Sequence, residues 1–209
     1  ILAVEHSYYF KEGYYIYLFN GRKSAMPVTE YLIRNAELYP DEVALVELNP
    51  DEKDTRRTTW KEFDLIQPSA DMPYRREITW SVFNEKANRF ANMLISRGVK
   101  KGDKVAILMY NCLEWLPIYF GVLKTGAIAV PFNFRYDSDE IYYCAELAQV
   151  DVIVFGFAFI GRIEVNAERL SRGRLLIYVG DNCPSFAESY HELVADCSSK
   201  EPDVKITED

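Results

Sequence analysis

The sequence has 209 residues, of which 49% are hydrophobic and 14% aromatic, enough to bury one substantial core or one core with a small satellite. Its net charge of −8 and pI of about 5.0 exclude a global electrostatic attraction to nucleic acid or to an anionic membrane. No apolar run approaches the ~20 residues that a membrane-spanning helix requires, so we expect no transmembrane segment.

The cysteines indicate a reducing compartment. Four of them are spread along the chain without a CxxC pair, at Cys112, Cys144, Cys183 and Cys197. We interpret them as scattered buried thiols, in preference to disulfides or zinc ligands, and we expect a cytoplasmic protein. The two histidines are too few for a His-rich metal site. The chain begins without Met or a signal peptide, so we expect it to be part of a longer protein.

Residues 1–25 carry two aromatic runs, residues 8–10 and 14–19, on either side of Gly13. This pattern predicts a β-hairpin, which we treat as an N-terminal extension. We expect its aromatic side chains to pack on the core or on a partner subunit, which makes a homodimer one arrangement to test. An aromatic platform for a ligand is the alternative.

The next segment predicts a helix, a strand and a polar region. Residues 27–39 fit a helix that begins near Pro27, and residues 43–46 fit a short buried strand. Residues 49–78 are polar and irregular, which indicates a surface insertion or a long hairpin.

From residue 79 helices and strands alternate regularly. A helix is predicted between the N-cap Thr79 and Gly98, and its apolar stripe comprises Val82, Phe83, Ala87, Phe90, Ala91, Leu94 and Ile95. Residues 104–109 then predict a central parallel strand. Asn111 and Glu114 predict a capping box for a second helix, which extends to Gly126.

The alternation continues toward the C-terminus. Residues 127–130, 152–155 and 175–179 predict strands. The segments between them predict a helix capped by Asp137 or Ser138 and a short helix near 159–170, and a last helix is predicted to open with Ser185-x-x-Glu188. The pattern predicts an α/β fold with a mostly parallel sheet and flanking helices. The charged residues 198–209 predict a linker or a frayed end.

The usual nucleotide and hydrolase motifs are missing. The sequence holds no GxxxxGK[ST], GxSxG, GxGxxG or HExxH pattern. A stand-alone NAD enzyme or P-loop enzyme is therefore not expected.

Residues 98–134 are the most informative block. They contain GxxxGDxV from Gly98, NxxEW from Asn111 and GxxxxGAxxVPxN from Gly121, with Asp139-Glu140-Ile141 following. In this order and spacing the motifs resemble the adenylate-forming superfamily of acyl-CoA synthetases, luciferases and adenylation domains. The resemblance spans roughly residues 27–180 and implies the first part of the N-terminal domain of such a ligase.

The resemblance also implies a domain organisation and an activity. Residues 26–197 form the α/β subdomain, with the insertion at 49–78, and residues 198–209 lead toward a phosphate loop that these residues do not contain. The full-length enzyme would use ATP, Mg2+ and CoA to convert a small-molecule carboxylic acid, as in fatty acid metabolism, into an acyl-adenylate and then a CoA thioester. No catalytic residue of the superfamily lies in this chain, so none of these ligands is expected to bind it tightly, and the chain is not expected to be active alone.

One residue of the block is a candidate for ligand binding. The resemblance places Arg135 where it can meet a phosphate of CoA or ATP, to which a guanidinium is well suited. A solvated surface arginine is the alternative. We interpret the remaining motif residues as structural, with Gly121 and Gly126 allowing close helix–sheet packing and a C-cap. A non-catalytic α/β binding or assembly module is the alternative function for the whole chain.

Overall fold

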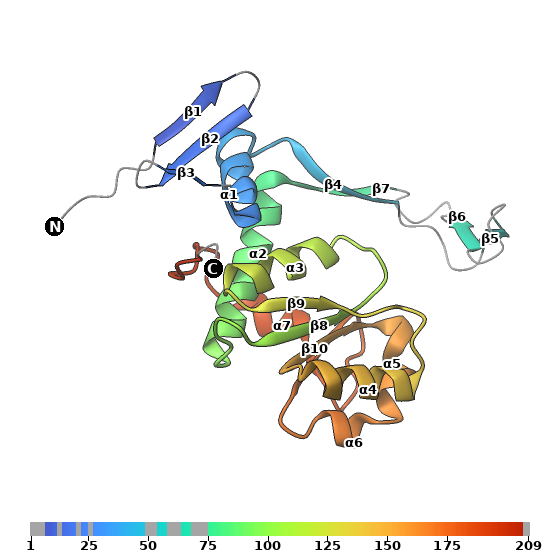
Figure 1. The fold of residues 1–209 in the computed structure, drawn as a ribbon. Helices are drawn as coiled ribbons and strands as arrows, with labels where there is room; N and C mark the ends of the chain where they lie inside the picture. The colour runs from blue at the N-terminus through green and yellow to red at the C-terminus, as the bar shows by residue number, and fades with distance from the viewer. Residues whose placement is uncertain are drawn as a thin grey trace.

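The computed structural model describes the backbone of residues 7–11, 14–19, 22–24, 27–48, 54–57, 64–67 and 75–206, and the side chains of 27–47 and 76–206. Its centre is a five-stranded parallel sheet in the order β12-β11-β10-β8-β9 (Figure 1). The strands are β8 (Lys104–Leu108), β9 (Ile128–Pro131), β10 (Val152–Gly156), β11 (Leu175–Val179) and β12 (Glu188–Ser189). The predicted α/β class with a parallel sheet and flanking helices is confirmed.

Helices cover both faces of this sheet (Figure 1). One face carries α2 (Trp80–Ser96), α3 (Trp115–Lys124) and α7 (Tyr190–Ala195); the other carries α4 (Ser138–Ala148), the 3-10 helix η1 (Phe157–Phe159), α5 (Ile160–Glu164) and α6 (Ala167–Leu170). The predicted single helix near 159–170 is therefore two short helices.

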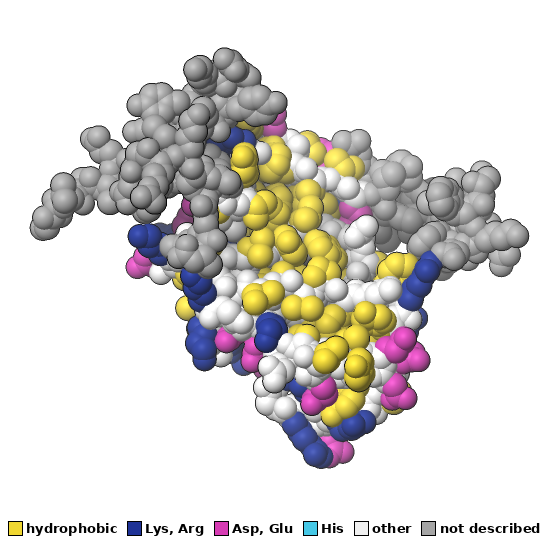
Figure 2. All heavy atoms as spheres, in the orientation of Figure 1, with side chains coloured by type: hydrophobic (Ala, Val, Ile, Leu, Met, Phe, Trp, Pro, Cys, Tyr) yellow, Lys and Arg dark blue, Asp and Glu magenta, His cyan; other side chains and the backbone are white. Residues whose placement is uncertain are grey.

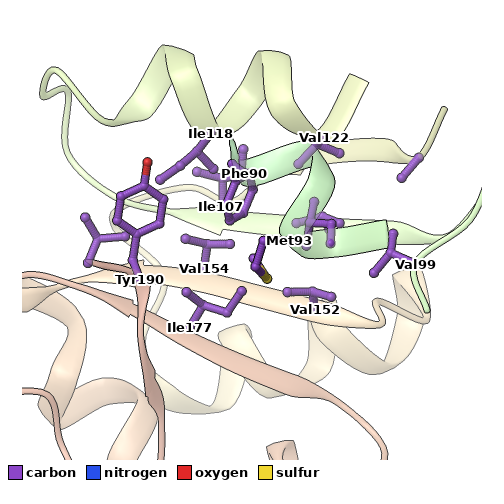
Figure 3. Packing of buried hydrophobic residues seen from close by; sticks show 14 of the residues in the cluster. Phe90, Met93, Val99, Ile107, Ile118, Val122, Val152, Val154, Ile177 and Tyr190 are labelled. Carbon is purple, nitrogen blue, oxygen red and sulfur yellow. The ribbon is translucent and has the colours of Figure 1, made fainter. Parts of the chain in front are cut away.

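Two apolar cores lie between the sheet and the helices. Alternate residues of each strand enter opposite cores. Ile107 of β8 and Val154 of β10 pack with residues of α2 and α3 (Figure 3). Leu108 and Phe155 belong to the other core, with residues of α4 and α5. A strand covered on both faces needs apolar residues at every position, which explains the continuous hydrophobic runs in the sequence. The central position predicted for residues 104–109 is confirmed.

The helices α2 and α3 approach each other closely at Gly121. A Cβ atom at Gly121 would lie 2.9 Å from the Ala87 carbonyl oxygen and 2.9 Å from Phe90 Cδ1. Gly121 thus permits helix–helix contact, and the predicted helix–sheet contact is wrong. Gly126, with φ +76°, follows α3 at the predicted position.

The ends of α2 match the prediction. Thr79 Oγ1 accepts a hydrogen bond from the Val82 amide at 3.4 Å, and Gly98 has φ +87° just beyond the helix. The predicted apolar stripe is partly wrong, since Val82 and Ile95 are each 37% exposed whereas Met93 is buried. The stripe is displaced because α2 packs against α3 as well as against the sheet.

Two predicted helix starts are wrong. Asn111 lies in a bend before α3, which begins at Trp115 without a side-chain cap. The bend is fixed from outside, because the Leu113 amide donates to Glu47 Oε2 at 2.9 Å. Further along, Glu188 and Ser189 pair with β11, and α7 follows with its Glu192 amide donating to Ser189 Oγ at 3.4 Å. At α4 the cap is Asp137, in a capping box with Glu140.

The N-terminal part forms α1 (Val28–Leu38) and antiparallel strands. In agreement with the prediction, β1 (Ser7–Lys11) pairs with β2 (Tyr14–Phe19), which also pairs with β3 (Arg22–Ser24). The side chains of these strands lie outside the described residues. The roles predicted for the aromatic runs and the extension therefore stay predictions.

The polar region 49–78 belongs to a long hairpin, which is one of the two arrangements predicted for it. β4 (Val43–Leu48) pairs antiparallel with β7 (Arg75–Thr79), and β5 (Asp54–Arg57) pairs with β6 (Asp64–Gln67). The predicted burial of residues 43–46 is wrong, since Val43 and Val46 are 44% and 46% exposed. Within the described residues β4 has only β7 as a strand partner.

The cysteines and the C-terminal segment also differ from expectation. All four thiols are free but only partly buried. Residues 198–201 are not frayed, because the carbonyl oxygens of Ser198, Ser199 and Lys200 accept hydrogen bonds from side chains of α2. The predicted linker role of residues 198–209 stays a prediction.

Candidate functional site

A cleft of about 390 Å³ opens at the carboxyl edge of the sheet. The chain leaves β8 toward α3 on one face and leaves the adjacent strand β10 toward η1 and α5 on the other face. Parallel α/β sheets bind ligands in the crevice that such diverging connections create. The cleft is lined by residues that follow β8, by residues at or after the ends of β10 and β11, and by one residue each of β4, β7 and α7. They are Glu47, Arg76, Met109, Tyr110, Asn111, Cys112, Glu114, Gly156, Phe157, Ala158, Phe159, Val179, Gly180, Asp181 and His191.

Aromatic rings form one wall of the cleft. Tyr110 is 50% exposed, and its ring centroid lies 5.2 Å from that of Phe159 and 5.7 Å from that of Phe134. Phe157, beside Phe159, is 61% exposed. Exposed aromatic faces next to an opening favour the binding of an apolar or planar group.

Charged groups of the β4–β7 hairpin close one side of the cleft. Arg76 Nη2 lies 2.8 Å from Glu47 Oε2, which also accepts the Leu113 amide. One carboxylate therefore connects the hairpin to the loop that follows β8. This connection fixes the start of α3 relative to the cleft, which local sequence signals do not reveal.

The turn after β11 is fixed by Tyr178 and Gly180. The Tyr178 hydroxyl donates to the Asp181 carbonyl oxygen at 2.9 Å, and a Cβ at Gly180 would lie 2.5 Å from that hydroxyl oxygen. With φ +151°, Gly180 also adopts a backbone conformation that other residues rarely reach. Burial, followed by the nearby charge of Asp181, raises the pKa of Tyr178, so this phenol stays protonated and keeps donating.

Cys112 is not poised as a nucleophile. Burial, followed by the charge of Glu114, raises the pKa of its thiol to about 11. The thiolate is the reactive form, and little of it exists near neutral pH. Cys112 therefore does not supply a nucleophile to the cleft near neutral pH.

Arg135 lies beside the cleft but does not line it. It follows β9 at the same sheet edge, is exposed, and its guanidinium carbon lies 5.5 Å from the centroid of the Phe134 ring. Because Phe134 contacts Tyr110, Arg135 adjoins the aromatic wall. Arg162 of α5 supports this loop by donating to the carbonyl oxygens of Phe134 at 2.6 Å and Tyr136 at 3.0 Å.

Sequence reasoning missed most of the cleft. Glu47 and Arg76 lie on strands beside or within the polar region, where a charged residue gives no signal of its own. Asp181 and the aromatic residues 157 and 159 follow buried strands directly, and that position is the signal that could have found them. Asn111 was assigned to a helix cap and instead lines the cleft.

Two further findings concern metals and membranes. In the part of the chain described, no group of three or more His, Cys, Asp or Glu residues is arranged to hold a metal ion. None of the helices in that same part has the length and hydrophobicity to span a bilayer.

Comparison with known proteins identifies the family. A model described as AMP-binding enzyme matches residues 32–208. The long-chain-fatty-acid–CoA ligase FadD13 of Mycobacterium tuberculosis is 30% identical over 141 residues, which are 67% of this chain and 26% of that protein. Crotonobetaine/carnitine–CoA ligase of Salmonella enteritidis is 38% identical over 84 residues, which are 40% of this chain and 16% of that protein.

A solved structure shows the same fold. The N-terminal domain of FACL13 from Mycobacterium tuberculosis superposes with a TM-score of 0.61 at 24% identity, covering 87% of this chain and 39% of that one. The chain thus spans only about a quarter of the length of FadD13, at 26%. Since the family model covers residues 32–208 of 209, the chain belongs to the AMP-binding enzyme family and corresponds to the N-terminal part of its acyl-CoA ligases.

Proposed function

We propose that the protein to which this chain belongs is an AMP-forming acyl-CoA ligase acting in the cytoplasm. The observation that carries the proposal is the family match over residues 32–208. In the first step a carboxylate oxygen of the substrate bonds to the α-phosphorus of ATP, the α–β anhydride bond breaks, and pyrophosphate leaves. In the second step the sulfur of CoA, having lost its proton, bonds to the acyl carbon, and AMP leaves.

In this proposal the described residues bind and orient the substrates. The acid, base and nucleophile of these steps come from elsewhere. We assign an apolar or neutral portion of a substrate to the cleft beside Tyr110. Among the residues that the structure describes, its lining includes the carboxyl groups of Glu47, Glu114 and Asp181 and the basic side chains of Arg76 and His191. A negatively charged group is therefore disfavoured inside the cleft and is better placed near Arg135.

Arg135 is the proposed phosphate ligand, either for CoA or for ATP. An exposed guanidinium fits a phosphate, because its planar donors match the phosphate oxygens. Arg162 holds the backbone of the loop on both sides of Arg135, which limits the entropy lost when a phosphate binds. We assign the Mg2+ that accompanies ATP to residues outside the described part of the chain.

The activity is tested by restoring the downstream sequence and measuring carboxylate-dependent ATP–pyrophosphate exchange. The panel of acids runs from acetate through long-chain to aromatic acids, because the sequence does not indicate which acid is used. Exchange with at least one acid is expected. If no acid of the panel supports exchange, the ligase assignment is wrong.

The assignment of Arg135 is tested with Arg135→Ala in the same full-length protein. We expect KM for CoA or for ATP to rise about tenfold or more, as loss of a charge-assisted contact predicts. Arg172→Ala is the matched control, because Arg172 is exposed, pairs with exposed Glu168 and does not line the cleft. If Arg135→Ala leaves KM unchanged for both CoA and ATP, the phosphate-binding role is wrong and Arg135 is a solvated surface arginine.

One observation favours the alternative of a binding or assembly module. Figure 2 shows hydrophobic side chains gathered in a band over α1, α3, β9 and α4. Tyr31 of α1, Ile128 of β9, and Tyr143 and Leu147 of α4 are 43%, 49%, 63% and 70% exposed. Continuous apolar surface is typical of an interface. Sedimentation of the whole protein distinguishes a homodimer from a monomer in which other parts of the ligase cover the band.

A further inference from the structure

Lys124, the last residue of α3, is a buried charge with a complete set of partners. Its side chain is 2% exposed. Its Nζ donates to Asn84 Oδ1 at 2.7 Å, to Asn88 Oδ1 at 2.6 Å and to Glu201 Oε2 at 2.6 Å. An ammonium group has three donors, and all three are used here.

The same asparagines also hold the segment that contains Glu201. Asn84 and Asn88 donate to Glu201 Oε1 at 2.7 and 2.9 Å, and Asn88 donates in addition to the Ser199 carbonyl oxygen at 3.0 Å. One turn further along α2, Asn92 donates to the carbonyl oxygens of Ser198 at 2.8 Å and Lys200 at 2.9 Å. Residues spaced four apart lie on one helix face, so three asparagines form a continuous ladder along α2.

Burial and pairing act in opposite directions on the pKa values of Lys124 and Glu201. Burial lowers the pKa of Lys124 although Glu201 works in the opposite direction. Burial works to raise the pKa of Glu201, but the hydrogen bonds from Lys124, Asn88 and Asn84 outweigh it and lower that pKa. Burying the ammonium is thus the unfavourable part, and Glu201 is the group that compensates for it.

The arrangement disfavours a shift of the segment by one residue. Glu201 offers its carboxylate to three converging donors, Lys124, Asn84 and Asn88. A shift by one residue would bring Lys200 against Lys124, where like charges repel, or Pro202, which has no acceptor on its side chain. Apolar packing could hold a segment equally firmly, but it would discriminate less between neighbouring registers.

We propose that Lys124, Asn84, Asn88 and Glu201 form a latch that fixes the position and direction in which the chain leaves this α/β unit for the rest of the ligase. This inference rests on the proposed function for its effect on catalysis. Lys124 acts as a positioning residue: it lies at the end of α3 opposite Glu114 and does not line the cleft. Lys124 affects the reaction by fixing the position of the segment that follows Glu201.

The latch is tested first by limited trypsin digestion, followed by mass spectrometry of the cuts after Lys200 and Lys205. Each rate of cleavage after Lys200 is divided by the rate for an unstructured peptide of the same sequence, because Glu201→Gln also changes the residue after the cleaved bond. Lys124→Met and Glu201→Gln should each raise this ratio about tenfold or more, because the first removes the donor that holds Glu201 and the second leaves the buried Lys124 without a counter-charge. Arg174→Met is the matched control: Arg174 is 12% exposed on its side chain and lies 2.6 Å from Glu146, away from the segment. It should leave cleavage after Lys200 unchanged.

Global unfolding is separated from latch opening by urea denaturation of each variant. Glu201→Gln changes a side chain that is 40% exposed and retains an oxygen that can accept from Lys124, so it is informative where Lys124→Met fails to fold. Cleavage after Lys200 that stays within about twofold of wild type in Glu201→Gln would overturn the latch.

The catalytic consequence is measured in the full-length protein. Lys124→Met should lower kcat for ATP–pyrophosphate exchange with little change in KM for the carboxylate, and Arg174→Met should leave both unchanged. Equal kcat values for wild type and Lys124→Met would overturn the positioning role. If wild type itself shows no exchange, the proposed function fails, whereas the digestion result still decides whether the latch exists.

Discussion

Gly121→Ala tests how closely the two helices on one face of the sheet must approach. The added Cβ would lie 2.9 Å from the Ala87 carbonyl oxygen and 2.9 Å from Phe90 Cδ1. Carbon atoms in favourable contact are about 3.5–4.0 Å apart, so α2 and α3 would have to separate by several tenths of an ångström. The obstacle at Ala87 is backbone and cannot rotate away. Phe90 is fully buried, which leaves its ring little room to move.

The expected magnitude is the difference between two effects. Alanine is favoured over glycine inside a helix by about 0.8–1.0 kcal/mol. Overpacking a well-filled core costs about 1–3 kcal/mol. The net expectation is a loss of about 0–2 kcal/mol in the free energy of unfolding, or a Tm lower by up to about 8 °C for a chain of this size.

Gly161→Ala is the matched control. Gly161 lies in α5, is exposed, and an added Cβ would meet no atom within 4 Å. This variant should therefore gain up to about 1 kcal/mol from helix propensity alone. Urea denaturation followed by far-UV circular dichroism measures both variants. A Gly121→Ala protein as stable as Gly161→Ala would refute the steric reasoning.

Three further predictions concern caps and titrating groups. Asp137→Ala should lower the free energy of unfolding by about 1 kcal/mol because Asp137 accepts two amides of α4, whereas Asn111→Ala should change it by less than about 0.5 kcal/mol; equal losses on urea denaturation would contradict the helix starts found here. Burial works to raise the pKa of Glu201, but the hydrogen bonds that its carboxylate accepts outweigh burial and lower that pKa. The ionised carboxylate therefore stabilises the fold above the ordinary carboxyl pKa, and this contribution is lost as the pH falls through the lower pKa of the folded state. Wild type should therefore lose more stability than Glu201→Gln on acidification from pH about 5, and parallel urea-midpoint curves would count against this. With its pKa raised from 9.0 to about 11, Cys112 should react with iodoacetamide at pH 8 about a hundredfold more slowly in the folded than in the unfolded chain; equal rates by mass spectrometry would show an accessible, ordinary thiol.

The regular part of the fold could be predicted because its signals are local. The continuous apolar runs 105–108 and 152–155 became neighbouring parallel strands, and Thr79, Asp137 and Gly98 marked helix ends as their chemistry requires. Local signals failed where a distant residue overrides them. Asn111 has the residue type of an N-cap, but the Leu113 amide is taken by Glu47, 66 residues away in sequence, and the helix starts later.

The candidate site was only partly within reach of the sequence. Arg135 was singled out through a resemblance, and its phosphate-binding role stays a prediction. The cleft beside it unites β4, β7 and α7 with the ends of three central strands. The position directly after buried strands marks Asp181 and residues 157 and 159, but no local pattern connects them with Glu47, Arg76 or His191.

The sequence by itself determined the alternation of helices and strands, the parallel sheet with its two covered faces, and the family motifs of residues 98–134, because hydrophobic period and turn chemistry act over a few residues. Only the tertiary structure decided which side chains meet. Lys124 and Glu201 lie 77 residues apart, and their pairing follows from the packing of α3 on α2 and the return of the chain past both helices. Burial makes such a long-range contact necessary, because a charge removed from water must find its partner inside the protein.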